Sequence, residues 1–64
     1  MRPEFVAYVR TAREARILRR RATRLGLDVD TSTIHASHPY KVRVYGASPE
    51  QKAEILAGVE VRGG

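Results

Sequence analysis

Four segments of the chain have the composition, or the alternation of apolar and polar residues, that favours a β-strand. Residues 4–10 are rich in aromatic and β-branched side chains, which fit a pleated sheet better than a helix. Apolar or β-branched residues alternate with polar ones over 27–33 and, more sharply, over 40–45. The pattern also predicts a short fourth strand at 59–62 and a loop at 34–39.

Two other segments have the pattern and the end signals of a helix. Between Thr11 and Leu25, one set of residues recurs at steps of three and four and shares a helical face, and Gly26 is the expected stop. A second helix is expected to begin after Ser48, because serine is a favourable N-cap and Pro49 suits the first helical position. The expected apolar face of this second helix contains Pro49, Ala53, Leu56 and Ala57.

The order of these elements is strand, helix, strand, strand, helix, strand. Strands separated by helices need crossover connections, and the right-handed rule favours an open sheet with the helices on one side. We therefore expect an α+β fold, a small ferredoxin-like βαββαβ plait with a four-stranded antiparallel sheet and two helices on one face. With 64 residues, the chain is expected to form one domain over 1–64, with 63–64 as a frayed tail.

The strand at 40–45 indicates which residues face the core. Val42 and Val44 alternate with Lys41 and Arg43, and burying the second set would leave two cations without partners. The valines are therefore expected to face the helices. In the hairpin of 27–33 with 40–45, this requires paired residue numbers with an odd sum, such as 29 with 44.

The opposite face of the sheet is expected to be open and to carry tyrosines among cations. Rings that stack on bases and cations that hold phosphate suit single-stranded nucleic acid. The alternative is an ordinary solvated face, in which Asp28, Asp30 and Glu60 pair with the cations. The candidate binding residues on this face and at its edge are Tyr8, Arg10, Lys41, Arg43 and Tyr45.

The first helix concentrates the positive charge of the chain. Segment 10–24 contains seven arginines and a single acidic residue, Glu14. The arginine guanidinium is planar and binds phosphate or carboxylate oxygens in pairs. The alternatives are a solvated helix face or a contact with acidic residues of another chain. The arginines that lie opposite the apolar stripe, here called the ridge, are Arg13, Arg16, Arg20 and Arg24.

Composition narrows the classes of function. The formal net charge of +5 favours polyanionic partners. There is no cysteine nucleophile, no glycine-rich phosphate loop and no zinc-finger spacing, so we expect neither an enzyme nor a cofactor or metal site. His35 and His38 are interpreted as ordinary loop residues. No apolar run approaches about 18 residues, so a cytoplasmic protein without membrane contact is expected.

Self-association is also expected. A chain this short buries a modest core, and without cysteine it has no disulfide to stabilise it. A homodimer would form through a sheet edge or through exposed apolar residues such as Val6 and Ile17.

The order and spacing of several segments resemble those of a SPOR domain. They are Phe5 to Val9, Ala15-Arg16-Ile17-Leu18, Leu25-Gly26-Leu27-Asp28-Val29, Lys41-Val42-Arg43-Val44-Tyr45-Gly46 and Ser48-Pro49-Glu50-Gln51-Lys52-Ala53. The resemblance covers most of the chain. It implies a βαββαβ fold and binding of peptidoglycan glycan strands on the sheet face.

These observations favour a non-enzymatic basic module that binds nucleic acid, either DNA or RNA, through the arginine-rich helix and the tyrosine-bearing face. Two alternatives remain. One is a protein-interaction or inhibitor module that docks on an acidic protein, and the other is the SPOR-like glycan binder.

Overall fold

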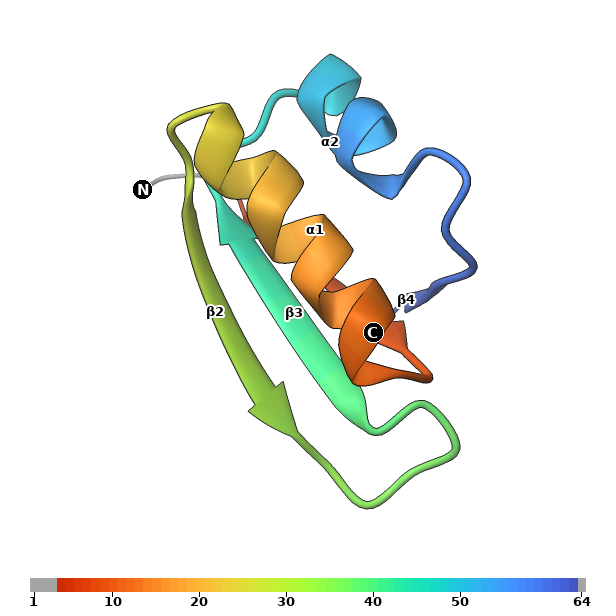
Figure 1. Ribbon diagram of the computed structural model, residues 1–64. Coiled ribbons are helices and arrows are strands. Elements are labelled where there is room, and N and C mark those ends of the chain that lie inside the picture. Colours follow the sequence, from red (N-terminus) through yellow and green to blue (C-terminus); the bar gives the residue numbers. More distant parts are fainter. Residues whose placement is uncertain (1–3, 64) are drawn as a thin grey trace.

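A computed structural model describes residues 4–63 of the chain. Both helices and the first three strands lie close to the positions predicted from the sequence. The elements follow in the order β1 (Glu4–Val9), α1 (Ala12–Arg24), β2 (Asp28–Thr33), β3 (Tyr40–Tyr45), α2 (Pro49–Leu56) and β4 (Arg62–Gly63) (Figure 1).

Local capping contacts account for where the helices begin and stop. Thr11 is the N-cap of α1: its hydroxyl oxygen accepts a hydrogen bond from the Glu14 backbone N–H at 3.2 Å. Ser48 and Gln51 form a complete capping box at the start of α2. Gly26 follows α1 with φ of 77°, a left-handed conformation that costs glycine little.

The prediction of a plait with four full strands is wrong. Three full antiparallel strands form it in the order β2-β3-β1, and β4 adds only a two-residue pairing at the far edge of β1. Residues 59–61 are not a strand, because the chain turns after α2 at Gly58, which has φ of 73°. Val59 and Val61 then pack against the core. Gly63 pairs with Ala7 instead of fraying, whereas Gly64 lies outside the described residues.

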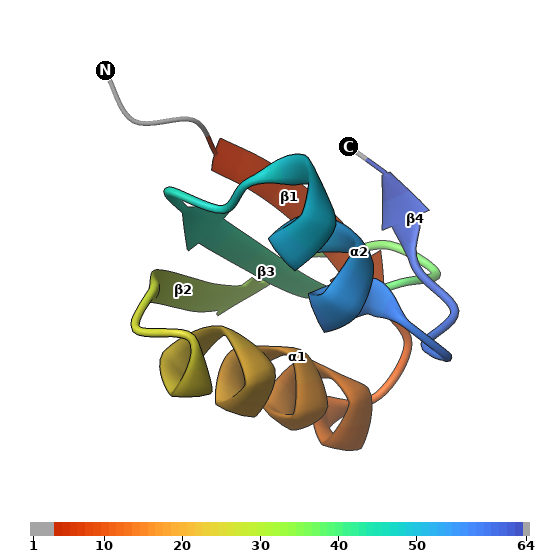
Figure 2. The same ribbon diagram turned by 90° about the horizontal axis from the view of Figure 1, so that it is seen from above.

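The predicted register of the β2–β3 hairpin is confirmed. Val29 lies opposite Val44 and Asp30 opposite Arg43, so the numbers of paired residues have an odd sum. The inner face therefore presents its apolar residues to α1, which packs over β2 and β3 on one side of the sheet (Figure 2). The buried core consists of Ala7, Val9, Ala15, Leu18, Ala22, Val42, Val44 and Ile55.

The apolar face predicted for α2 needs correction. Leu56 is half-buried and packs against the core as expected, but Ile55 is fully buried, and Pro49, Ala53 and Ala57 are exposed. The physical reason is the position of α2, which packs beside α1 and inserts Ile55 into the shared core.

The apolar residues expected at a dimer contact also lie differently from the prediction. Val6 and Ile17 are both half-buried. Among the described residues, the exposed large apolar side chain is Ile34, in the loop between β2 and β3.

Candidate nucleic-acid interface

The four ridge arginines all lie on the outer surface of α1. They are exposed, and they stand opposite the buried side of the helix formed by Ala15, Leu18 and Ala22. Within residues 4–63, no acidic side chain forms an ion pair with any of them. The ridge is therefore a continuous strip of positive charge that the rest of the described chain does not neutralise.

The acidic residue of α1 does not neutralise the ridge either. The carboxylate of Glu14 accepts a hydrogen bond from the Thr11 hydroxyl at 2.9 Å, which keeps it at the N-terminus of the helix. There it is favoured by the positive end of the helix dipole.

Other arginines of segment 10–24 point in different directions. Arg21 donates hydrogen bonds from Nη1 to the carbonyl oxygens of Ile55 at 2.9 Å and Ala57 at 2.7 Å, so it ties α1 to the end of α2. Arg10 lies beyond β1, where its Nε donates a long hydrogen bond to His38 Nε2 at 3.4 Å. The ridge is therefore a candidate surface for phosphate, whereas Arg21 of the same segment connects the two helices.

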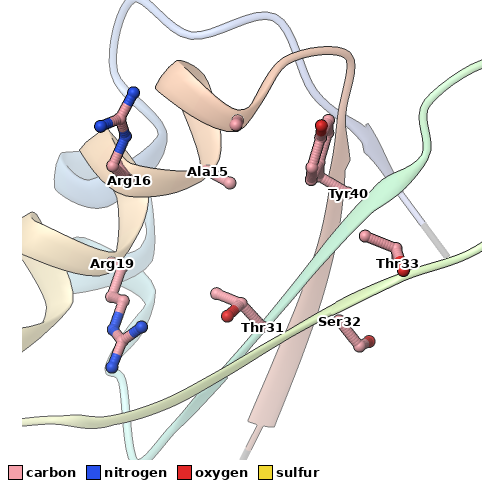
Figure 3. Close-up of a pocket in the computed structure, with 8 residues that line it drawn as sticks. Ala15, Arg16, Arg19, Thr31, Ser32, Thr33 and Tyr40 are labelled. Carbon is pink, nitrogen blue, oxygen red and sulfur yellow. The ribbon is translucent and has the colours of Figure 1, made fainter.

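Arg19 and Arg16 border a groove between α1 and the edge strand β2 (Figure 3). The groove has a volume of about 350 Å³. Its lining combines small and aromatic residues with hydroxyl groups and the two arginines: Ala12, Ala15, Arg16, Arg19, Thr31, Ser32, Thr33 and Tyr40.

The open face of the sheet is divided into an acidic end and a basic end. Strand pairing arranges its residues in three rows across the sheet. The rows are Asp28–Tyr45–Glu4, then Asp30–Arg43–Val6, then Ser32–Lys41–Tyr8–Arg62. Because carboxylates occur only in the first two rows, the candidate residues named from the sequence do not form one uniform platform.

At the acidic end, Arg43 and Tyr45 are engaged by neighbours on the same face. The Nε of Arg43 lies 3.7 Å from a carboxylate oxygen of Glu4. The Tyr45 hydroxyl donates a hydrogen bond to Asp30 at 3.2 Å. The pKa of Arg43 is raised above its ordinary value, because its neighbours stabilise the charged guanidinium. Tyr45 makes the largest contribution, and the Glu4 carboxylate adds to it. These contacts agree with the alternative of a face whose charges pair with one another.

At the basic end, the half-buried Tyr8 lies between Lys41 and Arg62. The β2–β3 loop contributes the exposed Ile34 to the same region. Tyr8, Ile34 and Arg62 border a hollow of about 210 Å³, whose lining also includes Ala36, Ser37 and His38. An aromatic ring between two cations, beside an apolar side chain, is suited to a flat ring that carries a phosphate.

The ridge and the open face belong to opposite sides of the molecule. The ridge is on the surface of α1 that faces away from the sheet, and the open face is the side of the sheet that α1 does not cover (Figure 2). The structure therefore separates the predicted site into two surfaces. Sequence patterns missed Arg62, Ile34 and His38 because their position beside Tyr8 depends on long-range pairing and on the loop.

The remaining features concern metals and membranes. In residues 4–63, no three side chains among histidine, aspartate and glutamate gather as a metal site would require. None of the described helices is both long and apolar enough to span a bilayer.

Comparison of the chain with family models, with curated proteins and with solved structures found no match.

Proposed function

We propose that this domain binds nucleic acid through the ridge Arg13, Arg16, Arg20 and Arg24. The observation that carries the proposal is the absence of any ion pair between these four arginines and an acidic residue within the described chain. Like charges at spacings of three and four residues destabilise a helix by a few tenths of a kcal/mol per pair. Attraction between the arginines and a bound polyanion would offset this repulsion.

The length of the ridge supports phosphates as the ligand. From Arg13 to Arg24 the helix rises by about 16 Å, at about 1.5 Å per residue. One strand of duplex DNA carries a phosphate about every 3.4 Å along the axis, so several phosphates are within reach of the ridge. The guanidinium groups would bind phosphate oxygens without reading the base sequence.

The basic end of the open face is a separate, second contact in this proposal. Tyr8 would stack on an unpaired base, and Lys41 and Arg62 would hold the neighbouring phosphates. Arg43 and Tyr45 have no part in it, because they are engaged at the acidic end. A bound strand reaches both surfaces only by passing round the edge of the domain, so we treat the ridge as the primary site.

Titration of the domain with labelled duplex and single-stranded oligonucleotides at two salt concentrations tests the proposal. If the four arginines each neutralise one phosphate, the logarithm of the duplex affinity should fall with the logarithm of salt with a slope of about −3.6. A denuded peptidoglycan glycan serves as the control, since its lower charge density should give a much weaker salt dependence than that of an oligonucleotide.

The outcomes separate the three classes of partner. If neither the duplex nor the single-stranded oligonucleotide shows salt-sensitive binding, the proposal is overturned. Tight, salt-insensitive binding to the glycan would favour the SPOR-like alternative. Salt-sensitive binding to an acidic protein, with none to oligonucleotides, would favour the interaction module.

A further inference from the structure

Strand β2 lies at an edge of the sheet, and within the described chain it pairs only with β3. The Ile34 N–H donates to the carbonyl oxygen of Pro39 at 2.8 Å, so these two residues form a hydrogen-bonded pair. Such pairs alternate with non-hydrogen-bonded pairs along an antiparallel ladder. The residues one, three and five positions before Ile34 therefore direct their N–H and C=O away from β3: Thr33, Thr31 and Val29.

The free backbone groups lie beside the groove of Figure 3. Thr31 and Thr33, whose N–H and C=O point outward, also line this groove. The opposite wall is α1, which contributes the small residues Ala12 and Ala15 and the charged residues Arg16 and Arg19. Both arginines are exposed, and neither forms an ion pair within residues 4–63.

We propose that this edge binds an extended acidic segment of another protein as an added antiparallel strand. The main chain of the segment would exchange hydrogen bonds with the outward groups of β2. Its side chains would alternate between the two faces of the enlarged sheet. Carboxylates on the α1 side of the segment would then contact Arg16 and Arg19. Side chains on its other side would lie next to Asp28 and Asp30, so they would be neutral or basic.

Charge argues against a second copy of this chain as the occupant. If two β2 strands paired about a two-fold axis, both α1 helices would lie on the same side of the joined sheet. The residues of β2 on that side are Val29, Thr31 and Thr33, none of them acidic. The arginines of the two helices would then face each other with no carboxylate between them.

The backbone edge also argues against nucleic acid at this position. Each outward residue presents a carbonyl oxygen beside its N–H, and the carbonyl oxygen would repel a phosphate. A peptide strand complements both groups.

Two labelled octapeptides of equal composition test the alternation. One alternates glutamate with threonine, so all its carboxylates lie on one face of a strand. The other has the residues in pairs, Glu-Glu-Thr-Thr repeated, which divides the carboxylates between the faces. At physiological salt, the alternating peptide should bind about three- to tenfold more tightly, since it makes more ion pairs with the arginines. Equal affinity for the two peptides would overturn the proposal.

Matched variants of α1 test the position of the contact. Arg19→Gln should weaken binding of the alternating peptide by about threefold. Arg24→Gln makes the same change of charge on the same helix but outside the groove, and it should leave the affinity unchanged. An equal loss in the two variants would mean attraction by net charge alone and would contradict the proposal.

The backbone contact is tested by Thr31→Pro. Because the Thr31 N–H points away from β3, proline there removes a donor of the free edge without breaking the β2–β3 ladder. Peptide affinity should fall by about tenfold or more, whereas Thr31→Ala, which keeps the N–H, should bind normally. A folded Thr31→Pro variant that binds like the unaltered domain would overturn the proposal.

A modified peptide provides a test that does not depend on folding of a variant. Consecutive N–H groups of a strand point to opposite edges. If two neighbouring central nitrogens of the alternating octapeptide are methylated, one of the two methyl groups therefore faces β2, and binding should be abolished. Unchanged affinity would exclude strand addition. If Thr31→Pro instead dissociates a homodimer of the domain, or removes oligonucleotide binding while no peptide binds, the occupant is a second copy or a nucleic acid and the proposal fails.

Discussion

Arg21 of α1 donates a hydrogen bond from Nη1 to the backbone carbonyl oxygen of Ile55 in α2, at 2.9 Å. The same nitrogen donates to the carbonyl oxygen of Ala57 at 2.7 Å. Carbonyl groups at the C-terminus of a helix lack partners within the helix, and a cation there also interacts favourably with the helix dipole. One arginine of the basic segment therefore holds the two helices together, while the ridge on the same helix faces solvent.

Replacing Arg21 should lower the stability of the fold. We expect Arg21→Gln to reduce the free energy of unfolding by about 1 to 2 kcal/mol, because glutamine is too short to reach both carbonyl oxygens. Arg20→Gln makes the same change one residue away on the exposed ridge, and its effect should stay within about 0.5 kcal/mol. Urea denaturation followed by circular dichroism measures both values. Similar losses in the two variants would contradict the structural role of Arg21.

Removing the ridge should separate binding from stability. The triple change of Arg13, Arg20 and Arg24 to glutamine should weaken duplex binding at low salt and flatten its salt slope by up to about 2.7. Thermal stability should stay level or rise slightly, since glutamine keeps helix propensity and removes repulsion. Arg16 is left unchanged because it also borders the β2 groove. A triple variant with an unaltered salt slope would mean that phosphates contact another surface.

The two tyrosines of the open face should behave differently. Tyr8→Ala should weaken binding of a single-stranded oligonucleotide by about 1 to 3 kcal/mol, with little dependence on salt, because stacking on a base is lost. Tyr45→Phe removes only the hydroxyl that donates to Asp30. It should leave oligonucleotide affinity unchanged. Fluorescence anisotropy measures the affinities, and a larger loss for Tyr45→Phe than for Tyr8→Ala would reverse the assignment of the two ends.

The anchor of α2 should be Ile55. Ile55→Val should reduce the free energy of unfolding by about 0.5 to 1.5 kcal/mol, because it removes a buried methylene group from the core. The exposed Ala53 provides the control: Ala53→Gln should change stability by no more than about 0.5 kcal/mol. Thermal denaturation compares the variants. If Ala53→Gln proved the more damaging, α2 would pack through the face expected from the sequence after all.

The elements that local signals specify agree with the sequence-based prediction. Thr11 and Ser48 begin helices because their side chains accept hydrogen bonds from the first turn, a contact made within four residues. The register of Val29 with Val44 was predictable because a shift of one residue would place Val29 on the face opposite Val42 and Val44, beside the charged residues of β3.

The errors fall where packing, not local pattern, decides. Instead of the strand expected at 59–62, only Arg62–Gly63 of the described residues after α2 pairs with β1. Val59 and Val61 bury apolar surface against the core instead of extending the sheet. The face of α2 was misassigned because in a helix of eight residues the apolar positions surround the axis, and contact with α1 selects Ile55.

For the candidate site, helical periodicity alone predicts that Arg13, Arg16, Arg20 and Arg24 form one exposed ridge, because it places them opposite the buried stripe. The roles of the other charged residues depend on how the elements pack. Arg21 reaches α2, Arg19 borders the β2 groove, and Arg43 lies beside Glu4. These partners come from elements distant in the chain. Their contacts therefore depend on how α1, α2 and the strands pack together, which no local spacing specifies.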